Sequence, residues 1–207
     1  MKFMSQVMFA AACVATLAPG LACAQAQNVR VRGTIEKVDG NAVMVKSREG
    51  AEFKLVLKDN ARVAGVVKAR LTDLKPTDNV AITSQRRADG GQEAIELRIS
   101  PAGQPFNSFQ GDWDLAPNTT MTNGSLQGAI ANFEGEVLTV TYKVKDQPDR
   151  EQKIVVTAST IIATTVPATL ADLKPGLKVF VAGAPRLADG SLDVAAIQVE
   201  KEIAPPQ

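Results

Sequence analysis

The six residues LTDLKP at positions 71–76 return as LADLKP at positions 170–175. The Gly-x-Ile triplet at 33–35 likewise matches a triplet of the same form at 128–130. The distance between matching positions grows along the chain, and each increase falls where the residues are typical of a surface turn, which tolerates insertions. The sequence therefore predicts two copies of one unit, each roughly 75 residues long.

Within each copy, apolar residues occupy every second position. In the first copy, Val29, Val31 and Ile35 alternate with polar residues, which predicts a half-buried strand. Gly33 interrupts this strand and predicts a bulge or sharp bend. The Asp-Gly pair at 39–40 predicts a hairpin turn, and the repeated Leu-x-Asp-Leu-Lys-Pro predicts a single helical turn that the proline ends.

These elements predict a small antiparallel barrel of the OB type in each copy, with residues 52–57 and 62–67 as two separate strands. The predicted fold class is all-β, with two tandem small antiparallel OB-like β-barrels joined by a structured segment rich in proline and aromatic residues. The predicted division of the chain is a signal peptide at 1–26, a first barrel at 27–100, a connecting segment at 101–125, a second barrel at 126–203 and a tail at 204–207.

The order of these features resembles a family of secreted bacterial domains of unknown function that have an OB-like barrel. The shared features are Gly-x-Ile, Asp-Gly, Leu-x-Asp-Leu-Lys-Pro, Ala-Asp-Gly and Ala-Ile, and they cover residues 28–100 and 126–202. All of them are turns or strand faces. The resemblance therefore implies a fold and brings no catalytic residues with it.

Residues 1–26 have the order of a secretory signal peptide: a basic start, an apolar run at 7–18 and an Ala-x-Ala end. The apolar run is about 12 residues long, whereas a membrane-spanning helix needs about 20. Cleavage is expected after Ala24 or Ala26, which predicts a periplasmic or secreted protein without a transmembrane span. A lipid anchor on Cys23 and an uncleaved membrane anchor are the alternatives.

Composition excludes several kinds of chemistry. The chain has no histidine, and its two cysteines, Cys13 and Cys23, both lie in the predicted leader. Hydrolases with a Ser-His-Asp or Cys-His site and histidine-ligated zinc or copper centres are therefore excluded. Only Met44 and Met121 remain outside the leader, too few for a methionine-rich copper carrier. We expect no enzymatic activity and no cofactor.

The predicted connecting segment at 101–125 is too rich in aromatic residues for a flexible linker. It holds Phe106, Phe109 and Trp113, and we expect these rings to pack onto a barrel or between the two barrels. The alternative is a ligand cleft, with these candidate binding residues: Asp112, Trp113, Asp114, Asn118, Thr120 and Asn123. The side-chain oxygen atoms of the Asp, Asn and Thr residues suit calcium or magnesium, but the spacing matches no EF-hand, so no metal site is predicted.

Charge is distributed unevenly. Residues 28–100 hold 14 basic and 10 acidic residues, a net charge of +4, whereas residues 101–207 hold 8 and 12, a net charge of −4. We interpret this as solvated surface that attracts the two halves to each other. Aromatic residues are too few in either barrel for base stacking, so no nucleic acid is expected.

The function expected is that of an exported, non-enzymatic binding or interaction module of the bacterial envelope, whose partner is an envelope protein or a small ligand. The alternative is a periplasmic cation- or small-ligand-binding protein that uses the Asp/Asn/Thr-rich central segment.

Overall fold

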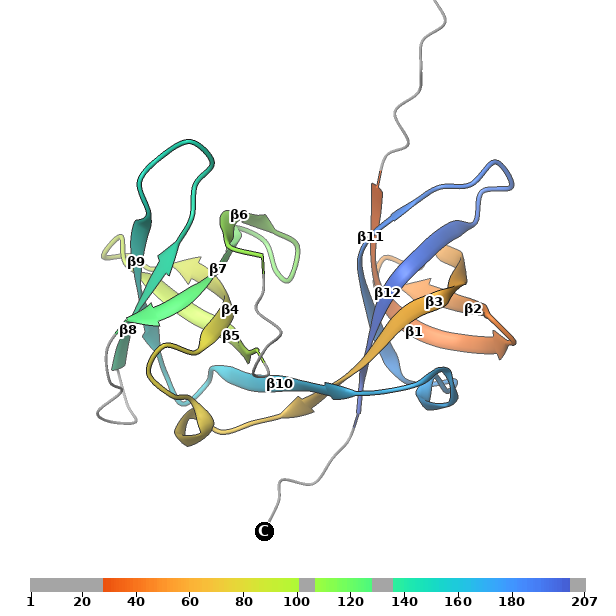
Figure 1. Ribbon diagram of the computed structural model, residues 1–207, viewed down its shortest axis with the longest axis horizontal. Helices are drawn as coiled ribbons and strands as arrows, with labels where there is room; N and C mark the ends of the chain where they lie inside the picture. The colour runs from red at the N-terminus through yellow and green to blue at the C-terminus, as the bar shows by residue number, and fades with distance from the viewer. Residues whose placement is uncertain (1–27, 101–106, 128–135, 202–207) are drawn as a thin grey trace, which may run out of the picture.

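The computed structural model describes residues 28–100, 107–127 and 136–201 (Figure 1). The strands are β1 (Asn28–Asp39), β2 (Ala42–Ser47), β3 (Glu52–Lys68), β4 (Asn79–Arg86), β5 (Gln92–Ile99), β6 (Phe109–Trp113), β7 (Thr119–Gln127), β8 (Glu136–Tyr142), β9 (Arg150–Val156), β10 (Ile161–Pro167), β11 (Lys178–Pro185) and β12 (Leu192–Glu200). The predicted all-β class is confirmed. The predicted leader with Cys23, and the Gly-x-Ile match at 128–130, lie outside the described residues.

Two single 3-10 turns, η1 (Leu71–Asp73) and η2 (Leu170–Asp172), occupy the repeated Leu-x-Asp-Leu-Lys-Pro, as predicted. In each turn, the aspartate accepts a hydrogen bond from the backbone N–H three residues earlier. The N···O distance is 2.9 Å from Arg70 to Asp73 and 2.7 Å from Thr169 to Asp172. These turns are the only helical segments within the described ranges, and neither is long enough to cross a membrane.

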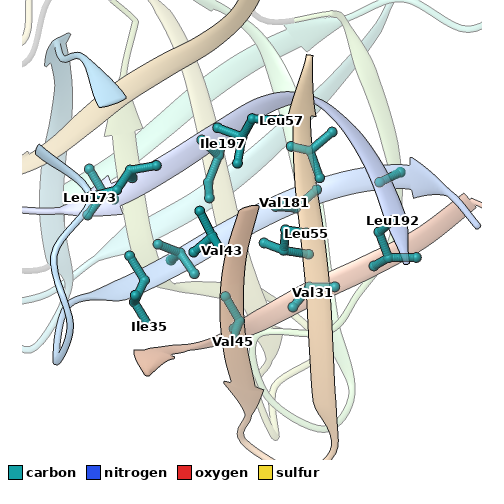
Figure 2. Close-up of a cluster of buried hydrophobic side chains, with 14 of the residues drawn as sticks. Val31, Ile35, Val43, Val45, Leu55, Leu57, Leu173, Val181, Leu192 and Ile197 are labelled. Atoms are coloured by element: carbon teal, nitrogen blue, oxygen red, sulfur yellow. The ribbon is translucent and has the colours of Figure 1, made fainter. Parts of the chain in front are cut away.

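Five strands form a closed barrel, which we call the β1 barrel. They follow the order β12-β11-β1-β2-β3, and the ring closes because β12 also pairs in parallel with β3. Its apolar core draws residues from both copies of the repeat, and Figure 2 shows Val31 and Leu55 of the first copy beside Leu192 of the second. Leu173, which follows η2, packs into the same core.

A second ring of five strands, the β7 ring, follows the order β5-β4-β7-β8-β9 and closes through the pairing of Glu93 in β5 with Val155 in β9. Its core is separate and also draws on both copies: Leu71, Leu74 and Leu97 from the first copy pack with Leu138 and other residues of the second. Figure 1 shows the two rings as two lobes that β3 and β10 connect.

The prediction of two tandem barrels, one for each copy, is not confirmed. Residues predicted as the first barrel pair instead in two groups: β1–β3 join β11 and β12, whereas β4 and β5 join β7 and β9. The physical reason lies in β3, which is one strand of 17 residues where the sequence predicted two. Its middle, at 58–61, contains neither glycine nor proline to turn the chain. The strand therefore runs out of the β1 barrel and carries η1, β4 and β5 into the other lobe (Figure 1).

The two copies are related by an approximate twofold axis at the pairing of β3 with β10. Val66 lies opposite Thr165 in this antiparallel pair, and the two positions are 99 apart, the same spacing as between the two Leu-x-Asp-Leu-Lys-Pro turns. The parallel pair β12–β3 and the parallel pair β5–β10 are equivalent under the same relation. The last two strands of each predicted copy therefore pair with strands of the other copy.

Gly33 is matched in the structure by Gly124, whereas Gly128, its match in the sequence pattern, lies outside the described residues. A Cβ atom on Gly33 would lie 2.2 Å from the carbonyl oxygen of Lys46, and one on Gly124 would lie 2.0 Å from that of Thr141. Only glycine allows this close approach of neighbouring strands. The connection from β7 to β8 is longer than the hairpin from β1 to β2, so the glycine of this close approach stands at a different spacing from Gly33 than the Gly-x-Ile match does.

Candidate functional site

Most of the predicted central site falls on the hairpin formed by β6 and β7. In this antiparallel pair, Asp112 lies opposite Thr120, and Asn123 lies opposite Phe109. Because neighbouring residues of a strand point to opposite faces, Asp112 and Thr120 share one face, whereas Trp113 and Asn123 lie on the other. The structure thus divides these candidate residues between two faces and does not gather them around one point.

The other polar candidates in this segment have local roles. Asn118 is exposed and adopts a positive φ of 57° in the turn before β7. The side-chain amide of Asn123 donates a hydrogen bond to the backbone oxygen of Asn107 at 3.1 Å. Within residues 28–100, 107–127 and 136–201, no group of three or more Asp, Glu, Cys or His side chains is placed to hold a metal ion.

Trp113 joins the hairpin to the outside of the β1 barrel. Its half-buried ring lies 4.0 Å from the guanidinium carbon of Arg30 in β1. The ring also meets Phe180 of β11 edge-on, at 5.9 Å between centroids, and Phe109 of its own strand at 6.3 Å. These cation–π and aromatic contacts fix the end of β6 against β1 and β11.

Asp114 is the counterion of two arginines in β1. Its Oδ1 lies 3.3 Å from Nη1 of Arg30 and 3.2 Å from Nε of Arg32. Arg48, just after β2, donates hydrogen bonds to the backbone oxygens of Asp114 at 2.7 Å and Leu115 at 3.0 Å. A metal cation at Asp114 would therefore have to displace arginine side chains that already hold this carboxylate.

A cavity of about 270 Å³ lies beside this contact and is bounded by strands of the β1 barrel, by β5 and by Leu115. Its wall is partly apolar, from residues such as Val66, Leu115 and Phe180, and five basic side chains also line it. Among its lining residues, Glu200 has the one carboxylate. The charged residues that line the cavity are Arg32, Lys46, Arg48, Arg98, Lys178 and Glu200.

Among the lining cations that form an ion pair, Arg32 of β1 has the least exposed side chain. Its side chain is only 12% exposed, and its guanidinium carbon lies 3.9 Å from the ring centroid of Phe180. Burial lowers the pKa of Arg32, an effect that Asp114 opposes and that nearby Arg98 reinforces. Arginine still keeps its proton at neutral pH, so this wall of the cavity carries a partly desolvated positive charge.

The remaining cations differ in how fully they are compensated. Arg98 donates hydrogen bonds to the side chains of Glu96 and Gln198, and Lys178 lies 3.7 Å from the carboxylate of Glu200 with both side chains largely exposed. Lys46 forms no ion pair with any other residue that the structure describes. The cavity therefore has an excess of positive charge.

Sequence reasoning missed this cavity. The net charge of +4 on residues 28–100 was the available signal, and it was interpreted as solvated surface. Lys178 and Phe180 belong to the second copy, and no pattern along the chain places them beside Arg32 of the first. Only the exchange of strands brings them together.

No family model, curated protein or solved structure matches this chain. The resemblance to secreted bacterial domains of unknown function therefore stays a prediction, and the function has to be inferred from the site itself.

Proposed function

We propose that this protein is an exported, non-enzymatic binding module of the bacterial envelope and that it binds an anionic ligand in the cavity beside Arg32. The observation that carries the proposal is the lining of the cavity, which includes five cationic side chains and one carboxylate. Asp114 and Glu96, outside the lining, pair with Arg32 and Arg98, and Lys46 has no ion pair among the described residues. Charge-assisted hydrogen bonds from arginine and lysine to an anion are stronger than those between neutral groups, and partial burial strengthens them further.

The finer fold assignment is also a proposal. We propose that both rings are small OB-like barrels, the fold of the secreted family that the sequence resembles. We further propose that the two barrels have exchanged strands. Five strands in each ring and one helical turn between the third and fourth repeat elements support this assignment. Export is supported by the signal-peptide pattern of residues 1–26.

Titration with tripolyphosphate at low ionic strength tests the proposed function. Trp113 is the only tryptophan in the chain and contacts Arg30 at the edge of the basic cluster, so its emission reports binding nearby. We expect a saturable change that weakens as salt is added. Lys46→Gln removes an uncompensated cation from the cavity and is expected to weaken binding by about threefold to tenfold.

Lys145→Gln is the matched control, because Lys145 is exposed beyond β8 and does not line the cavity. It is expected to bind as the wild type does. Asp114→Asn removes the carboxylate that competes for Arg30 and Arg32, so it is expected to tighten binding. The absence of saturable binding, or equal losses in the two lysine variants, would contradict the proposal.

A further inference from the structure

In the β7 ring, β6 pairs with one edge of β7, whereas the equivalent edge of β1 in the β1 barrel is open among the described residues. Strand β6 runs antiparallel to the first half of β7, with residues 109–113 opposite residues 119–123. The hydroxyl of Ser108 accepts a hydrogen bond from the backbone N–H of Lys143 at 2.6 Å and donates one to the backbone oxygen of Asn123 at 3.3 Å. Gln110 accepts a further hydrogen bond from the Tyr142 hydroxyl at 2.9 Å.

The equivalent edge in the β1 barrel is the first half of β1. Because Gly33 corresponds to Gly124, residues 28–32 of β1 correspond to residues 119–123 of β7. Strand β2 joins β1 only from Gly33 onward, and β11 pairs with the opposite edge. Among the described residues, no strand pairs with residues 28–32 on the side of β2.

The backbone of β1 is oriented to receive such a strand. The carbonyl oxygen of Arg32 points toward β2, because it accepts a hydrogen bond from the N–H of Arg48 at 3.2 Å. Backbone groups of alternate residues point to the same edge of a regular strand, so we expect Arg30 to direct its N–H and C=O to this edge as well. The pairing of β1 with β11 shifts register beside Arg30, between Val29 and Val31. In the β7 ring, the equivalent groups are the N–H of Lys143 and the carbonyl oxygen of Asn123. The Ser108 hydroxyl bridges them, so they do not bond directly.

Charge distinguishes the two edges. In the segment that fills the β7 edge, residues 107–110 are uncharged and Asp112 is the one acidic residue of β6. The positions around residues 107–110 include Asn79, Asn123 and Thr141. The equivalent positions of the β1 barrel are basic: Lys178, Arg32 and Lys46. All three line the cavity. An occupant of the β1 edge therefore needs negative charge where the occupant of the β7 edge has none.

We propose that the first half of β1, with the cavity beside it, binds an extended acidic segment of a partner protein, which adds to the sheet as an antiparallel strand. Its backbone bonds to Arg30, and carboxylates at alternate positions meet Arg32, Lys46 and Lys178. Strand addition gives affinity through the backbone and specificity through alternate side chains. This inference rests on the proposed function and names the class of ligand that the basic cavity takes.

The test uses an acetylated nine-residue peptide in which glutamate alternates with threonine and valine. Two control peptides are matched to it: one with glutamine in place of glutamate, and one with N-methyl groups on alternate backbone nitrogens. We expect the acidic peptide to bind at least about tenfold more tightly than either control, because it alone combines charge with an intact pairing edge. Binding is expected to slow hydrogen exchange of the Arg30 amide.

Variants of the full chain complete the test. Lys178→Gln is expected to weaken binding of the acidic peptide and to leave the weak binding of the glutamine peptide unchanged, and Lys145→Gln is expected to affect neither. If the acidic and N-methylated peptides bind equally, or the Arg30 amide stays unprotected, strand addition is wrong, while binding of tripolyphosphate still upholds the anion site. If neither peptide nor tripolyphosphate binds, both proposals fail.

Discussion

At the scale of single residues, Trp113 is one of the residues that hold the β6–β7 hairpin to the β1 barrel. It makes one aromatic contact with Phe180 and lies over the Arg30 guanidinium, but its side chain is only half-buried. Aromatic pairs contribute about 0.5–1.5 kcal/mol and cation–π contacts about 0.5–1 kcal/mol at exposed sites. The contribution of this residue to stability should therefore be smaller than that of a fully buried tryptophan.

We expect Trp113→Ala to lower the free energy of unfolding by about 1–3 kcal/mol, below the 3–5 kcal/mol typical of full burial. Urea denaturation followed by circular dichroism measures the change. Trp113→Phe keeps an aromatic ring over Arg30 and is expected to retain most of the stability. An alanine variant as stable as the wild type would show that the hairpin is held elsewhere.

At the scale of elements, the aspartates of the two helical turns have different ion-pair partners: Asp73 in η1 pairs with the neighbouring Arg70, whereas Asp172 in η2 pairs with a distant lysine. Asp172 in η2 lies 2.7 Å from Nζ of Lys201, directly after β12, and the N–H of Lys201 also bonds to the oxygen of Val66 at 2.9 Å. Hydrogen bonds from Lys201 and from the backbone of Thr169 lower the pKa of Asp172 to about 2, against an ordinary value of 3.8. Lys201 thus ties the end of the β1 barrel to both η2 and β3.

This pKa predicts the pH dependence of stability. Because the folded state holds the Asp172 proton less tightly than the unfolded state, the stabilisation is complete only about one pH unit above the ordinary pKa of 3.8 and is lost as the pH falls toward 2. Lys201→Gln is expected to lose less stability than the wild type between pH 5 and pH 2, as measured by urea denaturation at each pH. Lys145→Gln should follow the wild type, and identical slopes for all three proteins would contradict the assignment.

Most elements could be predicted from the sequence, but their partners could not. Alternation at Val29, Val31 and Ile35, the Asp-Gly turn and the Leu-x-Asp-Leu-Lys-Pro turn are local signals, and each corresponds to an element in the structure. Pairing is different. Both β4 and β11 carry alternating buried residues, Val80 and Ile82 in β4 and Val179 and Val181 in β11. Local patterns of this kind do not show which of the two strands lies beside β1.

The candidate site was harder to predict for the same reason. The six residues chosen from the sequence are neighbours along the chain, whereas the cations of the cavity come from β1, β2, β5 and β11 and from the residue after β2. Such a set is visible only after the strands are placed. Of the six residues chosen from the sequence, Trp113 is the exception: a lone tryptophan in a proline-rich segment indicates packing, and the structure places its ring against Arg30 and Phe180.

At the scale of the whole molecule, the exchange of strands makes the β7 ring continuous along the chain. Every residue of its apolar core lies between Ala69 and Ile162, whereas the core of the β1 barrel needs residues from both 29–63 and 168–199. A core contained in one stretch of chain can form without the rest, although a unit of this size is only marginally stable. Residues 69–162 should therefore form an autonomous folding unit.

We expect the isolated fragment 69–162 to unfold cooperatively in urea and to show dispersed amide resonances. The fragment 28–100, which is one copy of the repeat, is expected to do neither, because β1–β3 lack β11 and β12 and because β4 and β5 lack β7 and β9. Cooperative unfolding of the fragment 28–100 would show that one copy can close on itself.

The position of the first and last strands in one barrel has a consequence for secretion. If the chain is exported as we propose, it leaves the translocation channel from its N-terminal end, so β1–β3 emerge first and β11 and β12 emerge last. The core residues Val31 and Leu55 then stay exposed to solvent until Leu192 and Ile197, which pack against them, have been exported. During that delay the β7 ring can mature, while the waiting strands are the part of the newly exported chain most exposed to aggregation and most in need of a periplasmic chaperone.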